Sequence, residues 1–214
     1  MNSPVVSLNT DRKERFAGLL ENPYVSMIQR DILDNGRLQG LSGLLRELNP
    51  SSVLDVGCGL GENSRLFPGH YLGLDNSFPR IAFASGRYQQ ARFVLADALR
   101  MPVRPGTFDL VMLIDTSHHL SDEQFMAVLQ TMRTASRRWV VVSDPLLFEG
   151  QSALSRFFYS LDRGARFRSE AELKAVLARC SGLRLEKFGV FHTFPGLYCH
   201  GVFVLDVAPV NCRV

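Results

Sequence analysis

The 214-residue chain has few cysteines, little net charge and no long apolar run. Since no stretch of about 18 or more apolar residues occurs, we expect no membrane-spanning helix. The four cysteines are far apart and form no CxxC pair, which argues against a zinc site and a disulfide framework. A formal net charge of +3 gives no indication of a nucleic-acid partner.

The first residues, MNSPVVSLNTDRKER, contain no basic segment followed by an apolar one, so we expect no signal peptide. The cysteine usage suits a reducing compartment, and we predict a cytoplasmic protein. Apolar residues make up 46% of the chain and charged residues 21%, which is typical of a globular protein with one sizeable core.

The hydrophobic periodicity changes near residue 50. Before it, leucines recur at helical spacing from Leu38 to Leu48, and we predict a helical segment there. From Ser51, short apolar runs alternate with amphipathic segments, which predicts a mostly parallel sheet with helices on both faces. Strands are expected over residues 52–56, 71–74, 92–95, 110–114 and 139–143, and helices over 61–67, 79–88 and 122–135.

This alternation breaks after Asp144-Pro145. An aromatic and arginine-rich stretch over residues 146–168 interrupts the sheet, and a helix over 169–180 follows. Two apolar runs, 183–190 and 198–207, close the chain. Because only a short loop separates them, we expect these runs to pair antiparallel.

The strongest local signal is VLDVGCGLG at residues 53–61, a strand that runs into a glycine-rich turn before a helix. Glycines in such a turn permit left-handed backbone and close approach to a ligand, and the helix start offers unpaired N–H groups. The dinucleotide pattern G-x-G-x-x-G/A does not fit, because its sixth position is Glu62 counted from Gly57 and Ser64 counted from Gly59.

Further signals follow in order along the chain. Asp75 ends the second strand, Asp97 follows the third, and Phe108-Asp109-Leu110-Val111 opens the fourth, after which comes His118-His119-Leu120. With D-x-G-x-G-x-G from Asp55, these features resemble the class I S-adenosylmethionine-dependent methyltransferases of the small-molecule, ubiquinone-biosynthesis type. The resemblance spans about residues 49–144. The alternative is that the acids merely cap turns, where aspartate is common.

The resemblance implies a Rossmann-like α/β fold. Its sheet has seven strands, mostly parallel with an antiparallel last strand, and helices on both faces. Residues 1–50 would form an N-terminal helical cap over the cofactor cleft. Residues 51–214 would form the methyltransferase core, with a substrate-cap insertion at about 146–168.

The resemblance also implies S-adenosyl-L-methionine as cofactor. In the family, the acid at Asp75 accepts from the ribose hydroxyls, and the acid at Asp97 with the next N–H, here Ala98, meets the adenine. Asp115 is expected against the methionine part. The expected cofactor-binding residues are Asp55, Gly57, Cys58, Gly59, Gly61, Asp75, Asn76, Asp97, Ala98, Ile114, Asp115 and His119.

Methyl transfer is a displacement at a sulfonium carbon, in which the enzyme aligns the reactants and excludes water. A hydroxyl acceptor gains from a general base, and His118 is our candidate because histidine titrates near neutral pH. The alternative is that this side chain only packs or caps a turn. The expected substrate contacts are Tyr24, Tyr159, Arg163, Arg166, His192, Tyr198 and His200.

We therefore predict methyl transfer to a small molecule, with oxygen, nitrogen and carbon acceptors all open. Arg163 and Arg166 favour an acidic or aromatic acceptor, because guanidinium groups bind carboxylates and phosphates bidentately. A solvated arginine face is the alternative. Other functions on the same fold are a cofactor-dependent cyclase or isomerase and a non-catalytic pseudo-methyltransferase that binds a partner. No metal, nucleic-acid or membrane partner is expected, and monomer and homodimer both stay open.

Overall fold

A computed structural model describes residues 37–161, 166–193 and 196–208. The helical segments expected before residue 37 lie outside these described residues, as do Tyr24 and Arg163. The division into an N-terminal cap and a core stays a prediction.

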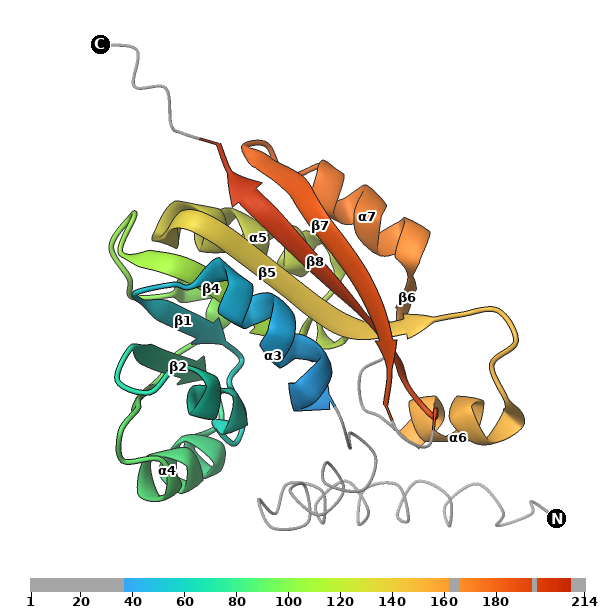
Figure 1. The fold of residues 1–214 in the computed structure, drawn as a ribbon, viewed down its shortest axis with the longest axis horizontal. Coiled ribbons are helices and arrows are strands. Elements are labelled where there is room, and N and C mark those ends of the chain that lie inside the picture. The colour runs from blue at the N-terminus through green and yellow to red at the C-terminus, as the bar shows by residue number, and fades with distance from the viewer. Residues whose placement is uncertain (1–36, 162–165, 194–195, 209–214) are drawn as a thin grey trace, which may run out of the picture.

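A sheet with the strand order β3-β2-β1-β4-β5-β8-β7 forms the centre of the molecule (Figure 1). Neighbours among β1 to β5 are parallel, whereas β8 is antiparallel to both β5 and β7. This confirms the predicted sheet, to which the two-residue β6 is added beside β5. The strands are β1 Val53–Val56, β2 Tyr71–Asp75, β3 Arg92–Leu95, β4 Phe108–Ile114, β5 Ser136–Leu147, β6 Arg168–Ser169, β7 Leu183–His192 and β8 Cys199–Val207.

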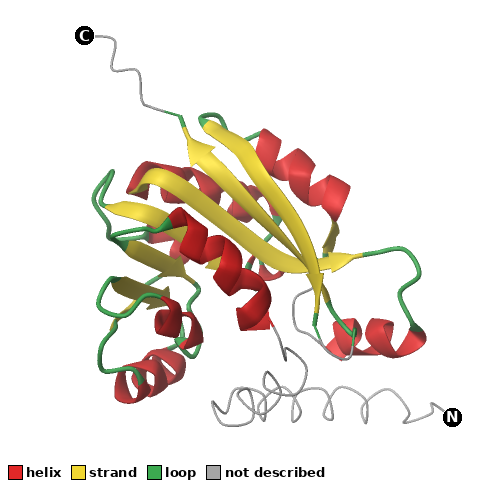
Figure 2. Cartoon of the chain, viewed as in Figure 1, coloured by secondary structure: helices red, strands yellow, loops and turns green. Residues whose placement is uncertain are grey.

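Helices cover both faces of the sheet, with α3 on one face and α5 and α7 on the other (Figures 1 and 2). In the part of the chain that is described, no helix is long and apolar enough to cross a membrane. The helices are α3 Arg37–Leu48, α4 Phe78–Arg87, α5 Asp122–Ala135, α6 Ala153–Leu161 and α7 Glu170–Ala178, and three 3-10 turns are η1 Glu62–Leu66, η2 Ala98–Arg100 and η3 Ser117–His119.

Local sequence fixes where α5 and α7 begin. Each starts with a capping box, in which Ser121 and Gln124 bond reciprocally in α5 and Ser169 and Glu172 do so in α7. In α5, Phe125, Leu129 and Met132 recur at helical spacing and are fully buried. One turn each of capping and one apolar stripe thus orient these helices on the sheet.

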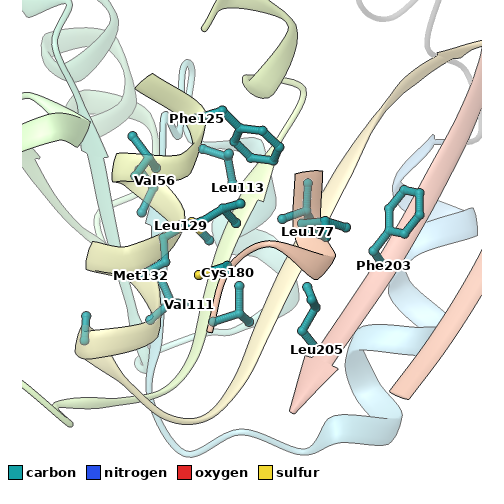
Figure 3. Close-up of a cluster of buried hydrophobic side chains, with 14 of the residues drawn as sticks. Val56, Val111, Leu113, Phe125, Leu129, Met132, Leu177, Cys180, Phe203 and Leu205 are labelled. Atoms are coloured by element: carbon teal, nitrogen blue, oxygen red, sulfur yellow. The ribbon is translucent and has the colours of Figure 1, made fainter. Parts of the chain in front are cut away.

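Successive strand residues point to opposite faces, so the sheet carries two cores. The core beneath α5 and α7 is shown in Figure 3, and the strand residues in it include Val56, Val111, Leu113, Phe203 and Leu205. The core beneath α3 takes the intervening residues, among them Val53, Met112, Val141, Val202 and Val204. This alternation places Asp55, Asp75, Ser143 and His200 on the α3 face, and Asp144 on the α5 face.

Two elements differ from the sequence expectation. The helix expected over residues 61–67 is a short 3-10 turn, η1. Its start is bent by Gly61 at φ 80°, and the Ser64 hydroxyl donates to the Gly61 carbonyl at 2.6 Å. Pro68 then disfavours helical backbone at Phe67. Likewise, β5 continues to Leu147, so the segment outside the sheet begins at Phe148 rather than at residue 146.

We expect Gly61→Ala to destabilise the fold more than Gly69→Ala does. Both glycines are left-handed, at φ 80° and 81°, which costs a side chain about 1–2 kcal/mol. A Cβ at Gly61 would also lie 2.8 Å from the Phe93 ring, whereas nothing lies within 4 Å of one at Gly69. The added overpacking costs about 1–3 kcal/mol. Urea unfolding of both variants measures the difference, and equal losses would contradict the packing of Gly61 on Phe93.

Candidate active site

The glycine-rich turn lies at the carboxyl edge of the sheet, between β1 and η1. Gly57, Gly59 and Gly61 adopt φ of 72°, 55° and 80°, all in the left-handed region. At Gly57 the backbone also approaches β4 closely, because a Cβ there would lie 2.6 Å from the Thr116 hydroxyl oxygen. Left-handed backbone and this close approach explain why glycine occupies the turn.

Asp75, at the end of β2, ties the turn to the start of α4. Its Oδ2 accepts the N–H of Gly59 at 2.9 Å, and its Oδ1 accepts the N–H of Ser77 at 2.8 Å. An ionised carboxylate has about four acceptor positions, so these two bonds leave capacity for further donors. The carboxylate therefore fixes the turn and can still accept hydroxyl groups of a ligand.

Asp55 is fully buried beneath the turn and supports it from within the sheet. Its Oδ2 accepts from the Tyr71 hydroxyl at 2.5 Å and from Asn63 Nδ2 at 3.0 Å. Burial raises the pKa of Tyr71 well above its ordinary value, and the nearby Asp55 carboxylate raises it further, so the hydroxyl stays protonated and donates. Tyr71 and Asn63 were not identified from the sequence, and a direct cofactor contact of Asp55 stays a prediction.

The remaining expected cofactor contacts are spread along the same edge. Asp97 is exposed and caps η2 by accepting the N–H of Leu99 at 2.9 Å, as the turn-capping alternative foresaw. Asn76 is exposed and Ala98 half-buried, whereas Cys58 and Ile114 are buried in the core beneath α3. Contact of these residues with a cofactor stays a prediction.

His118 forms a buried pair with Asp144, the residue near the end of β5 that sequence reasoning did not select. His118 Nδ1 lies 2.7 Å from Asp144 Oδ1, and the Ser117 hydroxyl donates to the other carboxylate oxygen. The imidazole stacks on Phe167 at 5.0 Å and on His119, which is exposed, at 4.2 Å. Since a carboxylate only accepts, it holds the proton of a neutral imidazole on Nδ1 and leaves the lone pair on Nε2.

Arg168 holds the turn that carries His118. Its guanidinium is buried and donates to the carbonyls of Ser117 and Leu120, both at 3.0 Å. It also binds Asp122 at 2.7 Å, and this hydrogen bond holds the pKa of Asp122 below its ordinary value. The segment that returns from α6 to the sheet thus fixes η3, a role that the sequence did not reveal.

A second carboxylate–imidazole pair lies on the α3 face. His200 on β8 is 1% exposed, and its Nε2 lies 3.4 Å from Asp115 Oδ1. Asp115 is a non-glycine residue at φ 49°, and its N–H donates to the Ser143 carbonyl at 2.8 Å. Strained backbone of this kind persists where the surrounding structure imposes it, and it clusters at functional sites.

Stacked aromatic rings join the two pairs. Tyr159 of α6 lies 4.7 Å from the ring of Phe167 and 4.9 Å from that of Tyr198, and Tyr198 lies 6.2 Å from His200. The Tyr159 hydroxyl donates to the Leu146 carbonyl at 2.9 Å, and burial raises its pKa. Tyr159 and Tyr198 are 5% and 6% exposed, so they form the packed floor of this region.

The other expected substrate contacts lie further out. The Arg166 guanidinium is 53% exposed and faces Asp122 at 3.5 Å, while its N–H donates to the His118 carbonyl. His192 is exposed and meets Phe148 edge-on. Among the described residues, no group of three or more His, Cys, Asp or Glu side chains could hold a metal ion.

Comparison with known proteins follows this geometry. Residues 53–138 match the family model described as a methyltransferase domain. A solved magnesium protoporphyrin IX methyltransferase from Synechocystis PCC 6803, with bound S-adenosylmethionine, superposes with a TM-score of 0.66 at 18% identity, over 97% of this chain and 100% of that one. The chain belongs to the class I S-adenosylmethionine-dependent methyltransferases. In this methyltransferase the matched residues contain β1 to β4 with the glycine-rich turn, Asp75 and Asp115.

Curated relatives match the same part of the methyltransferase. Tocopherol O-methyltransferase of Arabidopsis thaliana is 30% identical over 125 residues, which are 53% of this chain and 36% of that protein. A tRNA carboxymethyluridine methyltransferase of the same plant is 38% identical over 74 residues, 34% of this chain and 18% of that protein. The chain spans about a third of the length of the first of these relatives.

We expect Arg168→Lys to lower the free energy of unfolding by about 2 kcal/mol, because lysine cannot serve both carbonyls and Asp122 at once. Arg184→Lys is the control, since the Arg184 side chain is 73% exposed. Its effect should stay within about 0.5 kcal/mol. Urea unfolding measures both, and a silent Arg168→Lys would contradict the clamp.

Within the described chain, the buried Ser143 hydroxyl has no hydrogen-bond partner. We expect Ser143→Ala to leave the free energy of unfolding unchanged or to raise it by up to about 1 kcal/mol, because an unsatisfied buried polar group is removed. Ser136→Ala is the matched control, as its buried hydroxyl donates to the Trp139 carbonyl at 2.8 Å. That variant should lose about 1 kcal/mol in thermal unfolding of the ligand-free protein. Equal losses would mean that the Ser143 hydroxyl is bonded in solution.

Proposed function

We propose that this chain transfers a methyl group from S-adenosylmethionine to a small-molecule acceptor. The observation that carries the proposal is the glycine-rich turn, with three left-handed glycines, bonded through Gly59 to the carboxylate of Asp75. Membership of the methyltransferase family adds to it. Cytoplasmic localisation stays a prediction from the sequence.

The residues present fit this cofactor. Asp75 has acceptor positions for two vicinal hydroxyls, and its bonds to Gly59 and Ser77 hold it in place for them. The left-handed turn allows close backbone approach, and Asp115 at the end of β4 adds a negative charge opposite it. When bound, the cofactor supplies an activated methyl group on a sulfonium. The chain itself binds, aligns the acceptor and excludes water.

Two imidazoles with carboxylate partners could take a proton from an acceptor. His118 is held by Asp144, and His200 by Asp115. Both lie at the carboxyl edge beside the aromatic floor of Tyr159 and Tyr198. Such a pair is needed only where the acceptor must lose a proton, as a hydroxyl does.

A small aromatic or acidic acceptor is supported by these rings and by the exposed Arg166. Tocopherol and magnesium protoporphyrin IX, the substrates named for two proteins similar to this chain, are also small molecules with ring systems. The acceptor atom is left open at this level of the proposal. A cyclase or isomerase that uses the cofactor without turnover, and a non-catalytic binding partner, are the alternatives.

We expect Asp75→Ala to weaken binding of both S-adenosylmethionine and S-adenosylhomocysteine by about 1–3 kcal/mol in calorimetric titration, because a buried acceptor is lost. Asp206→Ala is the control. It removes a carboxylate from β8 that faces Arg184 at 3.6 Å, and it should leave the affinity unchanged. Unaltered binding by a folded Asp75→Ala protein would contradict this site.

Turnover separates the alternatives. The purified protein is incubated with S-adenosylmethionine and either the small-molecule or the RNA fraction of a cell extract, and S-adenosylhomocysteine is measured. Release with the small-molecule fraction is the expected result. Release only with RNA would replace the acceptor class, and binding without release would favour the cyclase or the non-catalytic reading.

A further inference from the structure

The two carboxylate–imidazole pairs lie on opposite faces of the sheet. Asp144 belongs to the α5 face, and His118 packs there between Phe167 and His119. His200 belongs to the α3 face, where its neighbours along β8 at the same parity, Val202 and Val204, pack in the core beneath α3. Only one pair therefore shares a face with Asp55 and Asp75.

A chain of contacts joins His200 to the glycine-rich turn. Thr116 fills the space above Gly57, and its hydroxyl lies 3.4 Å from the Gly57 carbonyl. Asp115 precedes Thr116 and faces His200 at 3.4 Å. The strained backbone of Asp115 directs its carboxylate between the turn and β8. The imidazole is thus linked to the cofactor turn through two consecutive residues.

The surroundings of His200 are apolar apart from Asp115 and two hydroxyl groups. Phe191 of β7 lies 5.2 Å from the imidazole ring, and Pro145 of β5 is its register partner. Tyr198 carries the other titratable group beside it. Ser143, two residues before Pro145 on the same face, contributes the buried hydroxyl that has no partner within the described chain.

We propose that His200, positioned by Asp115, is the general base of the methyl transfer, and that the acceptor atom is a hydroxyl oxygen. This inference rests on the proposed function. Because Nε2 faces a carboxylate, which can only accept, the neutral imidazole carries its proton on Nε2 and its lone pair on Nδ1. Nδ1 is therefore the atom that receives the proton.

The step balances without a further reactant. The acceptor oxygen forms a bond to the methyl carbon, the carbon–sulfur bond breaks, and its electron pair stays on sulfur, which becomes a neutral thioether. The hydroxyl proton passes to Nδ1 of His200 and then to water. The Asp115 carboxylate stabilises the imidazolium that forms, and the Ser143 hydroxyl supplies a hydrogen bond to the acceptor.

The assignment places His200 close to the sulfonium, and this can be tested without knowing the acceptor. A protonated imidazole repels S-adenosylmethionine, which carries the sulfonium charge, but not S-adenosylhomocysteine, which lacks it. The amino and carboxyl groups are common to both ligands, so their own titration cancels in the ratio of the two affinities. Calorimetric titration of the full chain with each ligand from about pH 5.5 to 8.5 spans the range in which histidine titrates.

In the unaltered protein, the preference for S-adenosylhomocysteine over S-adenosylmethionine should rise about three- to tenfold as the pH falls, because two like charges come close together. His200→Gln should make the ratio independent of pH. His118→Gln is the matched control and should keep the pH dependence. Asp115→Asn should shift it to lower pH, because the imidazolium loses its carboxylate, and asparagine tolerates the left-handed backbone at this position.

Each other outcome counts against the proposal. A ratio that does not change with pH, or a change that survives in His200→Gln, overturns it. A change lost in His118→Gln instead assigns the base to His118. If His200→Gln does not fold, Asp115→Asn decides, since an unshifted profile contradicts the pair. Failure of the unaltered protein to bind either ligand at any pH contradicts the proposed function itself, and this inference falls with it.

Discussion

Parallel pairing of β1 with β2 and β4 is the constraint on which the site depends. In a parallel sheet all carboxyl ends meet at one edge, so the residues that follow each strand converge although they are distant in sequence. Gly57, Asp75 and Asp115 come together in this way. The buried bond between Gly59 and Asp75 then fixes the turn against the next strand.

The antiparallel β8 extends this edge with a residue of a different kind. Because β8 runs against β5, its first residues, rather than its last, lie beside the carboxyl ends of the parallel strands. His200 thereby faces Asp115, which comes from the opposite strand direction. The late part of the chain supplies an imidazole to a site that the first half of the sheet builds.

The segment between β5 and α7 is bound firmly to the rest. Tyr159 donates to the Leu146 carbonyl, and Arg168 donates to two carbonyls around η3. Several aromatic rings that were expected to contact a substrate are packed in this way against one another. Their contribution to an acceptor site is therefore its shape as much as direct contact.

Strand alternation, the glycine-rich turn and the capping boxes are local signals, and they predicted the sheet, its order of elements and the place of the turn. Local reasoning was less successful at η1, where the helix expected from apolar spacing gave way to the left-handed Gly61 and the back-bonding Ser64. It also missed Asp144, Arg168 and Tyr71, each of which is a common residue type with no distinctive neighbours in sequence.

By itself, the sequence determined the α/β class, the family and the position of the cofactor turn, because these follow from periodicity and from glycine where no other residue fits. Only the tertiary structure decided which carboxylate meets which imidazole. Asp144 with His118 and Asp115 with His200 are separated by 26 and 85 residues, as their numbers show. Such pairs depend on strand register and on which face each residue takes, and both are set by packing of the whole sheet.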